Sequence, residues 1–177
     1  MSPRTLCAAA FCLATLACAS AARAEPWTFG AFQIDWPDGY VHQDDPDLDQ
    51  FVNADGVGVT VEVLGHGKMT SQDEQASVHR WQSYGHDQLV GMAARHGDVV
   101  IPLRDEKLAS GLELLSVADQ HTTDTSKTFG LFFLLISPDG RIVQITVEGP
   151  GTADDRMGEF RPAINTARWT AAAAPKK

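Results

Sequence analysis

The stretch of sequence that decides the fold is FGLFFLLISPDGRIVQITV, residues 129–147. It opens on an unbroken apolar run from Phe129 to Ile136, which has the length of a strand buried on both faces and is far too short to cross a membrane. Residues 137–140, Ser-Pro-Asp-Gly, are typical of a tight turn. After the turn, every second residue from Val143 to Val147 is apolar. We therefore expect two neighbouring antiparallel strands at the centre of a sheet.

Further strands extend this sheet on both sides in the sequence. Segments 99–103 and 112–117 precede the central run, and residues 51–63 predict a hairpin that turns at Asn53-Ala54-Asp55-Gly56. The valines from Val57 to Val63 alternate with other residues, as in a half-buried strand. We expect a single strand over Phe29 to Trp36, and a polar loop over residues 41–50.

Two helices complete the pattern. Ser71 to Glu74 form a capping box, and a stripe with a spacing of three and four residues follows it (Val78, Trp81, Gly85, Leu89 and Met92). Gly85 weakens this helix, and Gly97 is a suitable C-cap. Thr152 is the expected N-cap of the second helix, which should kink or restart at Pro162.

The order of these elements predicts an α+β fold. It consists of a mostly antiparallel sheet of about six or seven strands, flanked by one long helix and a C-terminal helix. We expect this single domain to cover residues 25–170, and a disordered tail to follow over residues 171–177. No later segment is long enough for a transmembrane helix.

Residues 1–24 have the pattern of a signal peptide. Arg4 precedes an uncharged run over residues 6–20, and the small-x-small sequence of residues 22–24 is a cleavage site. The alternative is a lipid anchor at Cys18, because residues 15–18 resemble a bacterial lipobox. All three cysteines lie in this leader, so a chain cut after Ala24 is free of disulfides. We expect a periplasmic or secreted protein.

The charge of the chain argues against some partners. The net charge is −9, and the leader contains two basic and no acidic residues, so 12 basic face 23 acidic residues after cleavage, a net charge of −11. Binding to nucleic acid depends on Lys and Arg contacts with phosphates, and this composition argues against it. An acidic surface suits solubility, cations or a basic protein partner.

Residues 32–40, Phe-Gln-Ile-Asp-Trp-Pro-Asp-Gly-Tyr, resemble the first strand and Pro-x-Gly-aromatic entry of PsbP-like domains. The Asp-Gly hairpin, long helix, antiparallel strands and closing helix follow in the same order, so the resemblance covers nearly all of residues 25–170. It implies a non-enzymatic accessory or binding protein. Similar folds occur among periplasmic immunity proteins of bacterial toxin systems. The family has no invariant catalytic set, so the resemblance assigns no site residue.

The acidic loop at residues 44–49 is the main candidate site. Asp45, Asp47 and Asp49 have the alternate spacing with which carboxylates surround Ca²⁺. The alternatives are a solvated loop, or a docking loop for a basic partner in which Asp44 and Asp45 take part. Trp81 and Tyr84 belong to the core or line a groove on the long helix that binds a partner.

No catalytic motif is present. The sequence contains neither Gly-x-Ser-x-Gly nor His-Glu-x-x-His. Glu113 and Glu148, near strand ends, are the carboxylates that could pair in a hydrolase. We therefore expect no catalytic residue and no cofactor apart from Ca²⁺. The favoured function is binding to a protein partner in the cell envelope, in the concrete version as an immunity or inhibitor protein. The alternatives are a small-ligand or Ca²⁺-binding accessory protein and a cryptic hydrolase.

Overall fold

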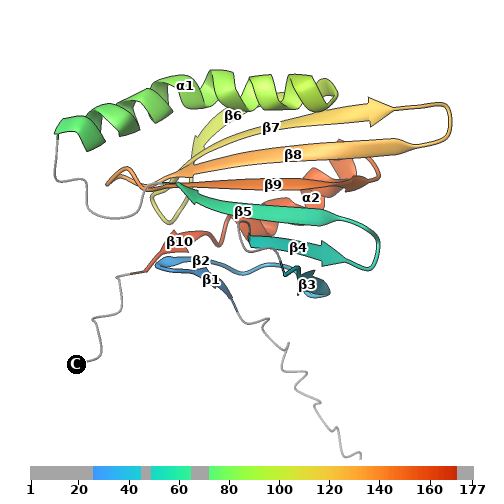
Figure 1. The fold of residues 1–177 in the computed structure, drawn as a ribbon, viewed down its shortest axis with the longest axis horizontal. Helices are drawn as coiled ribbons and strands as arrows, with labels where there is room; N and C mark the ends of the chain where they lie inside the picture. The colour runs from blue at the N-terminus through green and yellow to red at the C-terminus, as the bar shows by residue number, and fades with distance from the viewer. Residues whose placement is uncertain (1–25, 45–48, 65–71, 171–177) are drawn as a thin grey trace, which may run out of the picture.

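The computed structural model describes residues 26–44, 49–64 and 72–170. It confirms the α+β fold, with one large and one small antiparallel sheet and two helices (Figure 1). The large sheet has the strand order β3 (Tyr40–His42), β4 (Asp49–Asn53), β5 (Gly58–Leu64), β9 (Ile142–Pro150), β8 (Lys127–Ile136), β7 (Glu113–Thr122) and β6 (Asp98–Lys107). The small sheet contains β1 (Trp27–Phe29), β2 (Phe32–Ile34) and β10 (Arg168–Trp169). The helices are α1 (Gln72–His96) and α2 (Ala153–Ile164).

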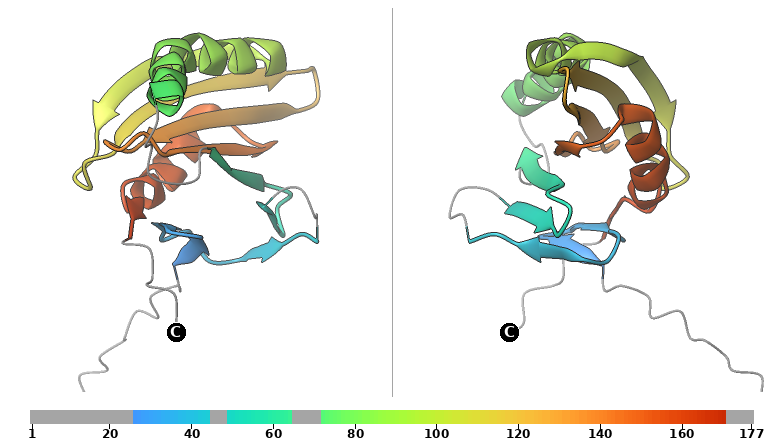
Figure 2. Two further views of the ribbon diagram at one scale, coloured as in Figure 1. Left: turned by 60° about the vertical axis from the view of Figure 1, so that its left-hand side comes forward. Right: turned by 90° about the vertical axis from the view of Figure 1, so that its right-hand side faces the viewer.

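Strand β8 is buried on both faces, as the sequence predicts. Its odd-numbered residues from Phe129 to Leu135 face a core shared with α2 and the small sheet. The even-numbered ones from Phe132 to Ile136 face a second core beneath α1. The large sheet therefore separates two apolar layers, with α1 on one face and α2 and the small sheet on the other (Figures 1 and 2).

Helix α1 lies close to the sheet because two glycines permit it. A Cβ on Gly85 would stand 2.9 Å from Leu134 Cδ2, so the glycine that weakens the helix also lets it approach β8. At Gly97 a Cβ would stand 2.8 Å from the carbonyl oxygen of Gln120. Gly97 does not have a positive φ, so close packing, rather than a left-handed cap, requires glycine there. Ser71, the first residue of the expected capping box, lies outside the described residues.

Helix α2 begins as predicted and ends differently. Thr152 is its N-cap, whose hydroxyl accepts a hydrogen bond from the backbone N–H of Asp155. The expected restart at Pro162 is wrong, because α2 continues to Ile164. The proline deprives only the carbonyl of Gly158 of its partner, and both residues are exposed, so water can satisfy that oxygen.

The N-terminal part corrects two further expectations. The single strand expected over Phe29 to Trp36 is two strands, β1 and β2, joined at Gly30, whose φ is +62°. The expected loop over residues 41–50 contains part of β3 and the start of β4. Short strands of this kind show no measurable period in a sequence, because their pairing depends on neighbours elsewhere in the chain.

Candidate binding site

A stack of four aromatic rings runs from the core to the surface. Phe160 and Trp36 are buried, with 0% and 2% of their surfaces exposed, and their ring centroids lie 5.3 Å apart. Trp27 stacks on Trp36 at 5.3 Å, and Phe51 stacks on Trp27 at 3.7 Å. Phe29 meets Phe51 edge-on at 6.0 Å. The stack fixes β1 and β4 against the core and leaves its last rings at the surface.

A cavity of about 460 Å³ opens at the outer end of this stack. We call it the aromatic cavity. Its lining residues come from β1, the turn after it, β3 and β4; they are Trp27, Thr28, Phe29, Gly30, His42, Asp49 and Phe51. This volume is within the range of small-ligand pockets, roughly 300–1,000 Å³. The cavity therefore combines aromatic walls with one titratable pair, His42 and Asp49.

Strand register brings the polar pair to the aromatic wall. His42 lies directly opposite Phe51 in the β3–β4 pair, and its ring meets the Phe51 ring edge-on at 4.9 Å. His42 Nε2 is 3.6 Å from Asp49 Oδ1, and about half of each side chain is exposed. The cavity already holds an imidazole, a group that can carry positive charge, between an aromatic ring and a carboxylate.

This arrangement favours a cation. Aromatic faces attract Lys and Arg side chains by about 0.5–1 kcal/mol at exposed sites, and a carboxylate nearby adds direct charge pairing. Asp49 is also the last residue of the predicted acidic loop, and Asp44, at its other end, is exposed. Asp45 and Asp47 lie outside the described residues, so the Ca²⁺ site that includes them stays a prediction. Among the residues that the structure describes, no group of three or more His, Cys, Asp or Glu side chains is placed to hold a metal ion.

Of the four predicted partner-binding residues, Asp44 and Tyr84 have side chains that the structure describes. Tyr84 lies on α1 with 61% of its surface exposed. Helix α1 packs on β6, β7 and β8, whereas β3 and β4, which line the aromatic cavity, lie at the other edge of the large sheet (Figure 1). Trp81 belongs to α1, but its side chain lies outside the described residues. The described ends of the acidic loop, Asp44 and Asp49, adjoin β3 and β4, so they are candidates separate from Tyr84 on α1. Sequence reasoning missed Trp27, His42 and Phe51, whose signal was an unusual number of aromatics near the start of the domain.

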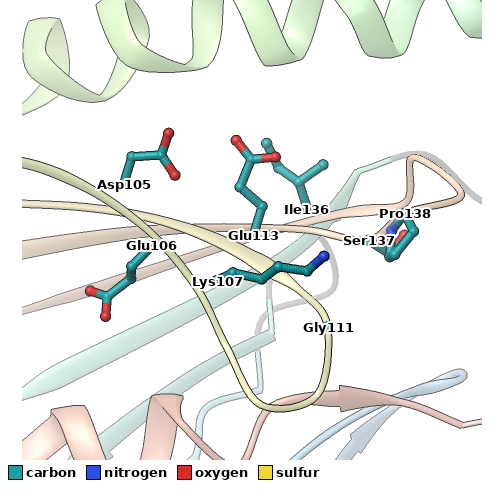
Figure 3. Close-up of a pocket in the computed structure, with 8 residues that line it drawn as sticks. All are labelled: Asp105, Glu106, Lys107, Gly111, Glu113, Ile136, Ser137 and Pro138. Carbon is teal, nitrogen blue, oxygen red and sulfur yellow. The ribbon is translucent and has the colours of Figure 1, made fainter.

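A second cavity, of about 430 Å³, is acidic rather than aromatic. Figure 3 shows Asp105, Glu106, Lys107 and Glu113 around it, on the ends of β6 and β7. Basic groups accompany these acids. Asp105 lies 4.0 Å from His86, Glu106 pairs with Arg161, and Lys107 is directly opposite Glu113 in the β6–β7 pair. Among the described residues, Glu106 is already paired with a guanidinium, whereas Asp49 faces only the imidazole of His42, and no aromatic residue lines this second cavity, so it is a weaker candidate for binding a basic partner.

The predicted pairing of Glu113 with Glu148 is wrong. Glu113 lies opposite Ile136, at one end of the β7–β8 pair. Glu148 lies opposite Gly130, towards the other end of β8. The two carboxylates are therefore at opposite ends of the sheet, and they cannot act together on one bond.

Comparison with known proteins bears on the fold. No protein-family model matches the sequence, and no curated protein sequence is significantly similar to it. A solved structure from Bacteroides thetaiotaomicron has a TM-score of 0.52 at 9% identity. The match covers 84% of this chain and 49% of the other, so this chain spans about half the length of that protein.

Two smaller proteins are also similar in structure. The Ran-binding protein Mog1p of Saccharomyces cerevisiae has a TM-score of 0.46 at 12% identity, with 79% of this chain and 90% of that chain covered. Cyanobacterial PsbP (CyanoP) from Synechocystis sp. PCC 6803 has a TM-score of 0.45 at 10% identity, with 82% and 91% covered. Within the described residues, no helix is long and apolar enough to cross a membrane. The solved structures that are similar to this chain thus include a PsbP, the family that residues 32–40 resemble.

Proposed function

We propose that this chain is an exported, non-catalytic binding protein that holds a basic segment of a protein partner in the aromatic cavity. The observation that carries the proposal is the composition of that cavity. Trp27 and Phe51 supply aromatic surface, and Asp49 supplies a carboxylate, within one hollow of about 460 Å³. A Lys or Arg side chain satisfies both kinds of group at once.

The charge of the whole chain supports a basic partner. A net charge of −9, or −11 without the leader, attracts cationic proteins and speeds their encounter. This attraction does not select one binding site on the surface, and salt screens it over about 8 Å at physiological ionic strength. The aromatic cavity would add the local specificity, because its stacked rings are held in place by the buried Trp36 and Phe160.

More specifically, we propose that the protein acts as an immunity or inhibitor protein in the cell envelope. The partner would be an exported enzyme or toxin with a basic segment near its active site, and covering that segment would block it. The signal-peptide pattern of residues 1–24 supports this compartment. A neighbouring gene for a toxin would favour it over a general accessory role.

The first test uses a defined cationic probe. Residues 25–177 are titrated with acetyl-Arg-Arg-Arg-amide, and with acetyl-Gln-Gln-Gln-amide as the neutral control, while NMR follows the indole resonance of Trp27. We expect Asp49→Asn to weaken binding of the arginine peptide by about 1 kcal/mol, roughly fivefold in Kd, as for a half-exposed ion pair. Glu113→Gln is the matched control, because it removes the same charge at the acidic cavity.

The outcomes separate site binding from general attraction. Weaker binding by Asp49→Asn alone supports the aromatic cavity. Equal weakening by both variants, with binding lost at modest salt, would show a nonspecific polyanion and refute the proposal. The second test is a pull-down from native envelope extract, with the wild-type domain and the Asp49→Asn variant as paired baits. A stoichiometric partner that only the wild-type bait retains is the expected result.

A further inference from the structure

A buried carboxylate and a histidine meet at the C-terminal end of α1. Asp119, on β7, is 0% exposed, and its Oδ1 lies 2.7 Å from His96 Nδ1. His96 is the last residue of α1, and 32% of its side chain is exposed. Asp119 Oδ2 is buried and makes no hydrogen bond within the described part of the chain. Burying a carboxylate costs free energy when one of its oxygens has no hydrogen bond, unless the charge of the group is neutralised.

The surroundings of the pair are mostly negative. His96 Nε2 lies 4.0 Å from Glu148 Oε1 on β9, and the C-terminal end of α1 itself carries partial negative charge. Asp98 begins β6, two residues after the end of the helix. Among basic residues, Arg95 precedes His96 on α1, and the charge of His121 acts on Asp119 from β7. The imidazole of His96 therefore lies between two carboxylates at the negative end of the helix dipole.

Close backbone packing surrounds the pair. A Cβ on Gly130 would stand 2.9 Å from Asp119 Oδ2 and 3.0 Å from His96 Nδ1. A Cβ on Gly97 would stand 3.1 Å from Asp119 Oδ1. Two strands and the end of the helix therefore converge on one carboxylate, and glycine makes the convergence possible.

We propose that Asp119 and His96 form a proton-dependent clasp that fixes the C-terminal end of α1 to the sheet. While a proton is held between the two side chains, the buried site carries little net charge and the helix end stays docked. Loss of this proton leaves a buried carboxylate without a counter-charge, which weakens the docking. Because β6 begins two residues after His96, its edge, with the exposed Val99 and Val100, would loosen together with the helix end.

The electrostatics of Asp119 give the direction of the effect. Burial raises the pKa of Asp119 above its ordinary value of 3.8, and the hydrogen bond and charge of His96, the Gly130 amide and the charge of His121 oppose it. A carboxyl group whose pKa is higher in the folded state favours folding when it is protonated. That contribution is present below pH 3.8 and is lost as the pH rises through the folded value. The clasp therefore loosens with rising pH.

Hydrogen exchange tests this proposal at the site itself. In residues 25–177, protection of the amides from Ala93 to Gly97, corrected for intrinsic exchange rates, should fall as the pH is raised from about 5 to about 9. In Asp119→Asn, protection should stay constant within about twofold over the same range, because no buried charge appears. His86→Gln is the control, since His86 is also on α1 but faces the exposed Asp105. It should keep the wild-type dependence.

Two results would overturn the clasp. One is protection in the wild type that does not change with pH, and the other is the same dependence in Asp119→Asn. A second measurement avoids any folding defect of the variant. In the wild type, NMR should show that the Asp119 carboxyl titrates above pH 3.8, and the amides from Ala93 to Gly97 should lose protection with the same midpoint. Loss of protection with a midpoint unrelated to that of Asp119 would also refute the proposal.

Discussion

Replacing Gly85 and Gly158 by alanine tests how closely α1 lies on the sheet. Both glycines are inside helices, so each substitution should gain about 0.8–1 kcal/mol of helix propensity. They differ in their surroundings. A Cβ on Gly158 would meet nothing within 4 Å, whereas a Cβ on Gly85 would stand 2.9 Å from Leu134 Cδ2 and 3.6 Å from Leu115 Cδ1. We therefore expect Gly158→Ala to stabilise the domain and Gly85→Ala to destabilise it.

The magnitude follows from the packing of Leu134. This side chain is 1% exposed and belongs to the core beneath α1, and the gap that it lines together with Gly85 is too small for a water molecule. Forcing one more methyl group into a packed core costs about 1–3 kcal/mol. After the gain in propensity, Gly85→Ala should destabilise the domain by about 0–2 kcal/mol, while Gly158→Ala should stabilise it by up to about 1 kcal/mol. The two variants should differ in Tm by about 2–12 °C.

Urea unfolding monitored by circular dichroism measures both changes on residues 25–177. A double-mutant cycle with Leu134→Val locates the cause, because valine lacks the methyl group that the new Cβ would meet. In that background, Gly85→Ala should cost about 1 kcal/mol less than in the wild type. If Gly85→Ala were as stabilising as Gly158→Ala, the helix would not press on β8 at this point, and the packing argument would be refuted.

Three further predictions follow from local contacts. Thr152→Ala should lower the free energy of unfolding by about 1 kcal/mol, measured in urea, because it removes the N-cap of α2. Phe133→Ala should cost about 3–5 kcal/mol in the same assay, because the ring is fully buried. Burial raises the pKa of Asp139, but hydrogen bonds from Arg141 and Ser137 overcome this effect and lower it below 3.8. Asp139 therefore stabilises the domain above pH 3.8 and ceases to do so as the pH falls through its folded pKa, and Asp139→Asn should flatten the acid limb of the stability profile.

The parts of the fold that sequence predicts best are those with local signals. The strand from Val57 to Val63 alternates in sequence, and in the structure its alternate valines enter the core shared with α2. The doubly buried β8 follows from an unbroken apolar run of strand length. Strands β3 and β10 have three and two residues, and their positions depend on pairing with β4 and β2, so no local pattern predicts them.

The aromatic cavity depends on contacts between residues that are distant in sequence. Trp27 stacks on Phe51, 24 positions later, and Trp36 stacks on Phe160 in the closing helix. An aromatic residue alone predicts burial, and its spacing does not say which ring it will meet. Asp49, the last residue of the predicted acidic loop, lines this cavity. The aromatic residues beside Asp49 in the cavity include Trp27 and Phe29, which belong to the first strand of the domain.

The contact between Asp119 and His96, in contrast, ends two apolar patterns that are visible in the sequence. Leu115, Val117 and Asp119 follow the strand period of two, and the first two face the core beneath α1. On the helix, Leu89 and Ala93 face the same core, and His96 continues their stripe at a spacing of three. Each pattern ends in a titratable residue where an apolar one would fit. Because β7 and α1 pack on each other, titratable residues that follow their apolar faces are expected to meet. The contact becomes visible in the sequence only when the period of the strand is continued past its last apolar residue to Asp119.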